Sequence, residues 1–277
     1  MPKISVLTAT HAAGAGFILE TAASIHGQVL PHGWDIEWVV QEDGASPGLS
    51  EAFSDMDGLT VRYEASGVQL GPGATRNLAL SRVTGDLIQV LDHDDLLLPG
   101  ALASLIPKFE EHPILWAVSA ADDLLEDGVR KSWDSALPFG IVPRGVVNDW
   151  AAEHGGNWPV HCAGLMMRTD AVRALGGWST TPVDEDIILF SAVSEMGDGW
   201  NGAEITWLYR QHPGQTTRAS TWSDLTSAGR RIALQRARAI RNTELALDLD
   251  ATARWGHSST EVTVGPGIKA PADLGTD

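Results

Sequence analysis

The sequence is poor in several residues and patterns that mark whole classes of protein. A single cysteine among 277 residues, Cys162, excludes an internal disulfide framework and a zinc site of several cysteines, and it fits a reducing compartment. No run of about 18 apolar residues occurs, and Met1-Pro2-Lys3 passes directly into a strand-like segment, so we expect neither a signal peptide nor a membrane span. We therefore expect a cytoplasmic protein.

Basic residues are also scarce. Lys and Arg number 19 against 36 Asp and Glu, which gives a net charge of −17 and repels nucleic acid and anionic lipid over most of the surface. A phosphorylated ligand would need local compensation from a metal ion or a few placed arginines. Hydrophobic residues make up 43% of the chain, enough for one large α/β domain with a tail, and nothing in the sequence indicates an oligomeric state.

The first hundred residues alternate strand-like and helix-like patterns. Strands are predicted at Ile4–Ala9, Ile36–Val40, Leu59–Tyr63 and Leu87–Leu91, and helices at Phe17–Ile25 and Ala74–Ser81. This alternation predicts an α/β fold with a mostly parallel, doubly wound sheet flanked by helices. Such sheets bind ligands beyond the carboxyl ends of their strands. We expect the polar groups at three strand ends to meet there, namely Thr10-His11, Glu42-Asp43 and Asp92-His93-Asp94-Asp95.

The remaining chain divides into an acceptor-side half and a C-terminal extension. A helix is predicted from Pro99 to Glu111, and the later elements are a strand at Leu115–Ser119, loops over residues 122–159, an extended segment Val160–Arg168, a helix Ala171–Leu175 capped by Asp170, a helix Asp186–Met196, a strand Ile205–Tyr209 and a helix Ser223–Leu247. We expect a nucleotide-binding half at residues 1–98, an acceptor-binding half of the same domain at 99–222, a C-terminal helix at 223–250 and a flexible tail at 251–277.

The cluster Asp92-His93-Asp94-Asp95 is the strongest single feature. Three carboxylates at the end of a buried strand repel one another, and a hard divalent cation or a dense set of hydrogen-bond donors would offset that repulsion. A metal that keeps part of its water shell and bridges two phosphates suits such a site. The alternative is structural: the cluster could simply be a charged cap for the helix that follows Pro99.

The order of the motifs resembles family-2 inverting glycosyltransferases of the GT-A fold. The nucleotide half of that family carries a Pro-Thr-Tyr-Asn-like segment, an Asp-Asp-Gly-Ser-like turn, an Ala-Arg-Asn helix start and an Asp-x-Asp-Asp strand end. The matching segments here are Val-Leu-Thr-Ala-Thr at 6–10, Val-Val-Gln-Glu-Asp-Gly-Ala at 39–45, Ala-Thr-Arg-Asn at 74–77 and 92–95, followed by Gly176-Gly177-Trp178, Asp184-Glu185-Asp186 and the segment 209–215. The resemblance covers roughly residues 3–220, and it departs at His11-Ala12, Glu42 and Ala45.

The resemblance implies a role for individual residues. It places Thr10, Asp43 and Arg76 at the nucleotide and Asp92 at the ribose or a metal-bound water. By the same likeness Asp94 is the direct metal ligand, His212 completes the metal or diphosphate site, and Asp186 is the general base, with Glu185 and Asp184 as alternatives. Taken singly, Asp43 is also a common turn residue, Arg76 could lie on a helix surface and His212 could terminate a strand.

The implied activity is metal-dependent glycosyl transfer. A sugar would move from a nucleotide diphosphate donor, with a UDP-sugar favoured, to an acceptor hydroxyl of a carbohydrate or small molecule, with inversion and with Mn²⁺ or Mg²⁺ as cofactor. Two alternatives are a non-catalytic sugar-nucleotide or carbohydrate-binding protein and a nucleotidyltransferase. The second is disfavoured because the glycine-containing segment His11–Gly16 has no lysine or arginine.

Tryptophans are concentrated in the second half, where indole rings could stack on sugars. Core packing is the expected role of most, although Trp158 and Trp178 flank the predicted acceptor cleft. His161 and Cys162 are predicted to point to opposite faces of one strand, which disfavours a catalytic dyad. The five arginines between 230 and 241 are interpreted as a solvated helix face rather than an anion site.

Overall fold

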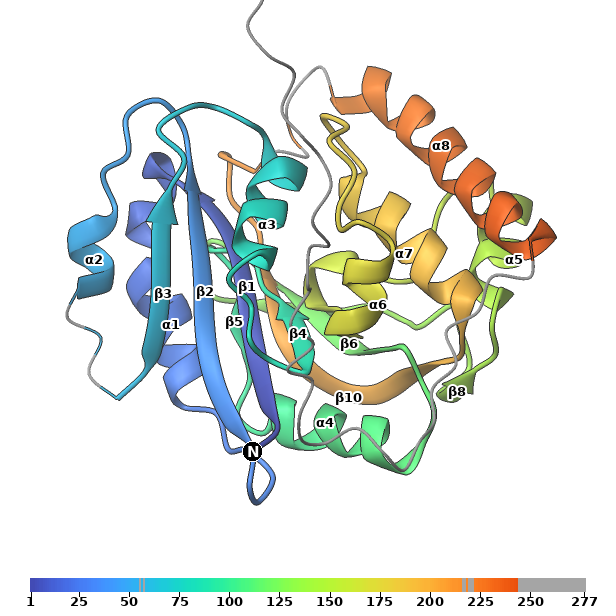
Figure 1. The fold of residues 1–277 in the computed structure, drawn as a ribbon, viewed down its shortest axis with the longest axis horizontal. Helices are drawn as coiled ribbons and strands as arrows, with labels where there is room; N and C mark the ends of the chain where they lie inside the picture. The colour runs from blue at the N-terminus through green and yellow to red at the C-terminus, as the bar shows by residue number, and fades with distance from the viewer. Residues whose placement is uncertain (55, 57, 216–217, 219–221, 244–277) are drawn as a thin grey trace, which may run out of the picture.

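The computed structural model describes residues 1–54, 56, 58–215, 218 and 222–243, and it has a single curled sheet flanked by helices (Figure 1). Ten strands form the sheet in the order β3-β2-β1-β4-β9-β6-β10-β5, with β7 added beside β6 and β8 beside β10. The predicted α/β architecture is confirmed.

The N-terminal strands are parallel and lie close to their predicted positions. They are β1 (Lys3–His11), β2 (Asp35–Asp43), β3 (Thr60–Ala65) and β4 (Leu87–Val90). Buried β-branched and aliphatic side chains run through β1, β2 and β4, as expected for strands covered on both faces. The parallel register aligns His11 with Asp43, so the polar ends of β1 and β2 are neighbours.

The second half of the sheet mixes directions. β9 (Met166–Arg168) runs antiparallel between β4 and β6 (Trp116–Leu124), and β10 (Gly199–Arg210) is parallel to β6. Two short strands pair antiparallel with β10, namely β5 (Leu96–Leu97) and β8 (Gly140–Val142), and β7 (Arg130–Ser132) pairs with β6.

Helices cover both faces of the sheet and enclose two apolar cores (Figure 1). One core includes α1 (Ile18–His26), α2 (Ser50–Ser54) and α4 (Ala101–Glu111), packed around Trp38 and Trp207. The other core lies around Trp116 and Phe190 under the remaining helices, which are α3 (Pro72–Leu80), α5 (Val146–Glu153), α6 (Thr169–Ala174), α7 (Glu185–Met196) and α8 (Trp222–Asn242). The two-sided cover makes the sheet doubly wound.

Three sequence-based predictions of local structure are wrong. Residues 122–159 are not all loops, because β7, β8 and α5 lie within them. Residues 160–168 are not continuously extended: a 3₁₀ turn, η2 (Cys162–Gly164), precedes β9. The cap of α6 is Arg168 and not Asp170, because the helix already begins at Thr169.

The C-terminal helix is fastened to the domain by its arginines. Arg241 donates to the buried Glu195 on α7 at 2.6 Å and to Asp149 on α5 at 2.8 Å, and Arg236 donates to the Leu175 carbonyl at 2.7 Å. The interpretation of a uniformly solvated arginine face is therefore wrong for these two positions. Residues 244–250 of the predicted helix and the predicted tail at 251–277 lie outside the described part. In the described chain, none of the helices has the length and apolarity needed to cross a membrane.

Candidate active site

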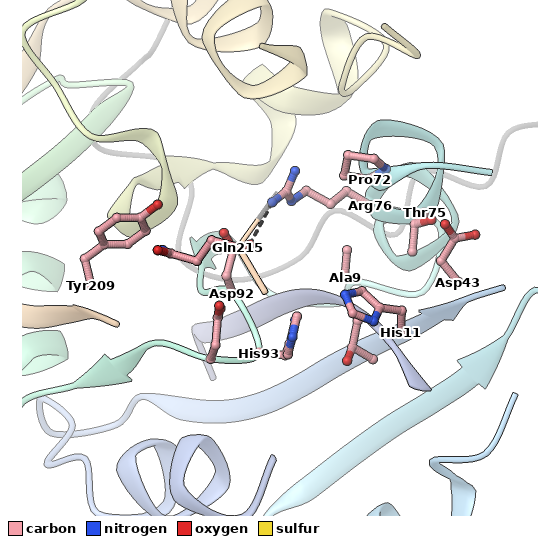
Figure 2. Close-up of a pocket in the computed structure, with 12 residues that line it drawn as sticks. Ala9, His11, Asp43, Pro72, Thr75, Arg76, Asp92, His93, Tyr209 and Gln215 are labelled. Carbon is pink, nitrogen blue, oxygen red and sulfur yellow. Dashed lines mark hydrogen bonds and ion pairs between the residues drawn. The ribbon is translucent and has the colours of Figure 1, made fainter. Parts of the chain in front are cut away.

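The polar strand ends meet at one cavity, as the doubly wound topology predicts. Its volume is about 190 Å³, and it lies beyond the carboxyl ends of β1, β2 and β4 (Figure 2). Its walls come from five regions of the chain and contain Ala9, Thr10, His11, Asp43, Pro72, Thr75, Arg76, Asp92, His93, Asp94, Tyr209 and Gln215. We call it the donor cavity, and six of the seven predicted site residues belong to it or touch it.

Asp43 lines the donor cavity and also shapes it. Its two carboxylate oxygens accept from the backbone N–H groups of Leu70 at 2.7 Å and Gly71 at 2.9 Å, so the segment before α3 is held against the end of β2. The neighbouring Glu42 has a structural role, because it accepts from the backbone of Gly48 and Leu49. Glu42, where the family pattern has aspartate, is thus an acidic residue that anchors the turn after β2. Recognition of the nucleobase by Asp43 stays a prediction.

Arg76 is buried between two carboxylates. Its guanidinium pairs with Asp92 at 2.7 Å (Figure 2). It also pairs with Glu185 at the start of α7. Burial alone would lower the pKa of Arg76, but Asp92 and Glu185 together raise it, so the side chain is cationic. The alternative that Arg76 lies on a helix surface is therefore wrong. Through its two ion pairs, Arg76 links the cluster at 92–95 to the segment 184–186.

Asp94 and His212 are brought together although 118 positions separate them. His212 Nε2 lies 2.8 Å from Asp94 Oδ2, and both side chains are largely buried. Within the described residues no set of three His, Cys, Asp or Glu side chains is grouped as a metal site. The Asp94 carboxylate is the type of ligand that Mg²⁺ takes together with waters and phosphate oxygens, whereas an imidazole is outside that oxygen set, so the metal role of His212 stays a prediction.

Asp95 has a different role from its neighbours. Its carboxylate is fully buried and accepts from the backbone N–H of Arg210 at 2.9 Å, while Arg210 Nε donates to the Asp94 carbonyl at 2.8 Å. Burial, followed by the charges of Asp94 and Asp92, raises the pKa of Asp95 well above its ordinary value. These contacts fasten the end of β10 to the acidic cluster and so place His212 beside Asp94.

A second cavity of about 340 Å³ adjoins the donor cavity, and we call it the acceptor cavity. The two share Pro72, Arg76, Asp92 and Tyr209. The other walls are formed by residues 160–163, 182–187 and Arg230. All three candidate bases, Asp184, Glu185 and Asp186, lie here.

The three candidate bases differ in their burial and in their hydrogen-bond partners. Glu185 is buried and pairs with Arg76; burial and the Asp186 charge raise the pKa of Glu185 to about 7, against the opposing effect of Arg76. Asp184 accepts from the Thr226 hydroxyl on α8 at 2.6 Å, and its backbone is left-handed with φ 57°. Asp186, in the first turn of α7, accepts only from the Ile187 backbone among the described residues, at 2.7 Å. Asp186 is thus the candidate base whose carboxylate bonds no side chain of the described residues, whereas Asp184 bonds Thr226 and Glu185 bonds Arg76.

One lining residue to which the sequence analysis gave no role is Tyr209. Tyr209 lies between the two cavities, and His161 packs against it with ring centroids 4.4 Å apart. The predicted opposite facing of His161 and Cys162 is wrong, since both line the acceptor cavity through the 3₁₀ turn. Burial raises the pKa of the Cys162 thiol well above its ordinary value, so it is a poor nucleophile.

The two singled-out tryptophans do not line either cavity. Trp178 is buried in the core, and its backbone N–H and carbonyl bond the side chain of Asn77. The Trp158 indole donates to Asn148 at 3.0 Å and packs against the same core. Core packing, the expected role of most tryptophans, therefore applies to both.

Comparison with solved structures agrees with this architecture. S. aureus TarS 1-349 in complex with UDP-GlcNAc superposes with a TM-score of 0.62 at 15% identity, over 83% of this chain and 66% of that one. The same protein in complex with UDP gives a TM-score of 0.59 at 18% identity, over 76% of this chain and 61% of that one. The fold is therefore that of the GT-A glycosyltransferases.

Sequence comparison gives the family. Residues 5–173 match the model of glycosyl transferase family 2, and the chain belongs to that family. A curated relative from Campylobacter jejuni, GalNAc(5)-diNAcBac-PP-undecaprenol beta-1,3-glucosyltransferase, is 31% identical over 115 residues, which are 40% of this chain. The match spans only 36% of that relative's length.

Proposed function

We propose that this protein transfers a sugar from a UDP-sugar to an acceptor hydroxyl, with inversion at the anomeric carbon and with Mg²⁺ or Mn²⁺ as cofactor. The observation that carries the proposal is the shared wall of the two cavities. Arg76, Asp92 and Tyr209 separate the acidic donor side from Asp186, so a donor and an acceptor bound in the two cavities would meet there.

The donor side has the groups that a nucleotide diphosphate requires. Asp94 and His212 would hold the cation, which when bound neutralises the charge that develops on the leaving diphosphate. Thr10 and Asp43 line the same cavity, and the nucleoside would bind beside them. The TarS complexes with UDP and UDP-GlcNAc support a UDP-sugar as the donor.

Asp186 would act as the general base on the acceptor side. The acceptor oxygen attacks the anomeric carbon, its proton passes to the Asp186 carboxylate, and the bond from that carbon to the phosphate oxygen breaks as UDP leaves. Asp186 lies in the first turn of α7, and it lines the acceptor cavity.

The acceptor would be a carbohydrate or another small molecule with a free hydroxyl. The relative's name describes a lipid-linked acceptor, so a carrier-bound glycan is one candidate for this chain as well. In either case the hydroxyl must reach Asp186 through the acceptor cavity.

The test is a thermal-shift screen of UDP, GDP, TDP and CDP sugars with and without Mn²⁺, followed by detection of released nucleotide. We expect a stabilising shift that needs both UDP-sugar and Mn²⁺, and UDP release. Asp170→Asn, an exposed carboxylate change outside both cavities, serves as the control for Asp94→Asn. Binding without any turnover across acceptors would favour the non-catalytic alternative.

A further inference from the structure

A third cavity adjoins the acceptor cavity and, among the residues that the structure describes, shares no lining residue with the donor cavity. It has a volume of about 130 Å³ and shares Val160 and His161 with the acceptor cavity. Its remaining walls come from β6, from the segment before β8 and from β10, and they comprise residues 118–121, 133–135, 139, 159 and 201–202. The two cavities are therefore neighbours on either side of residues 160–161.

Two large aromatic side chains on this wall are open to solvent. Trp133 is 56% exposed and Phe139 is 57% exposed, both on the segment between β7 and β8. The ammonium of Lys131 lies 4.3 Å from the centre of the Trp133 ring and supports one of its faces. Exposed aromatic rings beside a cavity provide flat apolar surface for a ligand.

The same cavity carries unused polar groups. Asn201 donates its amide hydrogens to Ser135 Oγ at 3.0 Å and to the carbonyls of Leu137 and Pro138, which fixes the segment that bears the two rings. No hydrogen bond within the described chain engages Asn201 Oδ1, the Ser119 hydroxyl or the Asp134 carboxylate. Acceptors and a hydroxyl are thus available to a ligand that lies on the rings.

One edge of the third cavity lies where the register of β10 against β6 is interrupted. The register of β10 against β6 shifts between Gly202 and Ile205 and again before Trp207. A Cβ at position 202 would lie 1.9 Å from Ser119 Oγ, so only glycine lets the strand pass this close to the serine. Bulges of this kind often redirect side chains beside binding sites.

We propose that this third cavity binds a second sugar ring of a carbohydrate acceptor, stacked on Trp133 and Phe139. Ser119, Asp134 and Asn201 would bond its hydroxyls, while the ring that is glycosylated lies at Asp186. The proposal rests on the proposed transferase function and adds that the acceptor has at least two sugar units. An alkyl chain fits less well, because it would cover these polar groups without bonding them.

The experiment compares acceptors of increasing length. UDP release is measured with methyl glycosides of glucose, galactose and N-acetylglucosamine, with the corresponding methyl di- and trisaccharides, and with octyl monoglycosides. The variants are Trp133→Ala, Phe139→Ala and the conservative Trp133→Phe. Trp150→Ala is the matched control, because Trp150 stacks on His154 at 3.7 Å and lines none of the three cavities.

The wild-type protein is expected to have a KM about threefold to tenfold lower for the disaccharide than for the monosaccharide in at least one series, the size of one stacking contact. Trp133→Ala and Phe139→Ala should lose this gain, whereas Trp133→Phe retains most of it and Trp150→Ala retains all of it. The monosaccharide KM, the donor KM and the UDP-induced thermal shift should not change in any variant.

Three results would overturn the proposal. In the first, the wild-type KM is no lower for the disaccharide than for the monosaccharide in any series. In the second, the lower disaccharide KM survives in both alanine variants. In the third, a Trp133-dependent lowering of KM occurs with octyl glycosides alone, which would assign the cavity to an apolar group. Absence of any UDP-induced thermal shift would instead refute the proposed donor function, so the two failures are distinguishable.

Discussion

Arg76 offers the sharpest test of how the two halves of the site are joined. Replacing it by methionine keeps most of its volume but removes the cation between Asp92 and Glu185. The Glu185 side chain is only 9% exposed, whereas Asp92 is 30% exposed and partly screened by water. Because breaking a buried pair leaves an uncompensated charge, we expect Arg76→Met to lower the free energy of unfolding by about 3 kcal/mol at pH 8.

The loss should depend on pH with a definite sign. The folded-state pKa of Glu185 is raised to about 7, so between the ordinary glutamate value and pH 7 the folded protein binds a proton that the unfolded chain does not. Its contribution to the free energy of unfolding therefore falls as pH rises through this window. Without Arg76 the pKa of Glu185 rises further, so the pH range in which the folded protein holds this proton extends above pH 7. At pH 5.5 Glu185 is protonated in both proteins and leaves no buried charge. The loss of unfolding free energy caused by Arg76→Met should therefore be smaller at pH 5.5 than at pH 8.

Urea unfolding of a double-mutant cycle at both pH values measures this effect. Glu185→Gln should recover part of the loss in the Arg76→Met background at pH 8, with a coupling of at least about 1 kcal/mol, and little at pH 5.5. Arg238→Met, an exposed arginine on α8, is the control and should change stability by less than about 0.5 kcal/mol. An equal loss at both pH values with no coupling would refute the buried-pair reasoning.

Three further predictions concern catalysis. Asp94→Asn should abolish turnover and Mn²⁺-dependent nucleotide binding in calorimetry, and full activity in chelator would contradict it. Asp43→Ala should raise the donor KM more than it lowers kcat in steady-state kinetics, because a nucleoside contact is similar in the ground and transition states; a pure kcat defect would exclude this role. Asp186→Asn should cut kcat by about 10²- to 10⁴-fold with donor binding intact, and NMR should show an inverted anomeric linkage. Retention would rule out single displacement, whereas inversion with an unimpaired variant would move the base to Glu185 or Asp184.

The parallel half of the fold could be predicted because its signals are local. Apolar runs such as Ile4–Ala9 and turn residues such as Asp43-Gly44 mark strands and their ends without knowledge of their partners. By contrast β7 and β8 are three residues each, and they exist only because they pair with β6 and β10. Three residues are too few to show the alternation of apolar and polar side chains by which a strand is predicted.

The sequence predicts which residues belong to the site, but it does not predict which of them contact one another. The acidic cluster and the candidate bases could be found by residue type and order. The pairing of Arg76 with Glu185, across 109 positions, and the anchoring of Arg210 by Asp95 depend on how separate elements pack. The sequence therefore identified Asp95 as part of a charged cluster without revealing that it fastens β10.

The attachment of α8 beside the predicted base has a consequence for how acceptor choice can change. Gly229 packs so closely that a Cβ there would lie 2.7 Å from Asp184 Oδ2, Thr226 bonds the same carboxylate, and Arg230 forms part of the acceptor cavity. None of these three residues lies within the matched family region at 5–173. A chimera that carries the α8 of another family member is therefore expected to accept different acceptors. Its preference for the donor nucleotide should stay that of the parent protein, because no described residue of α8 lines the donor cavity.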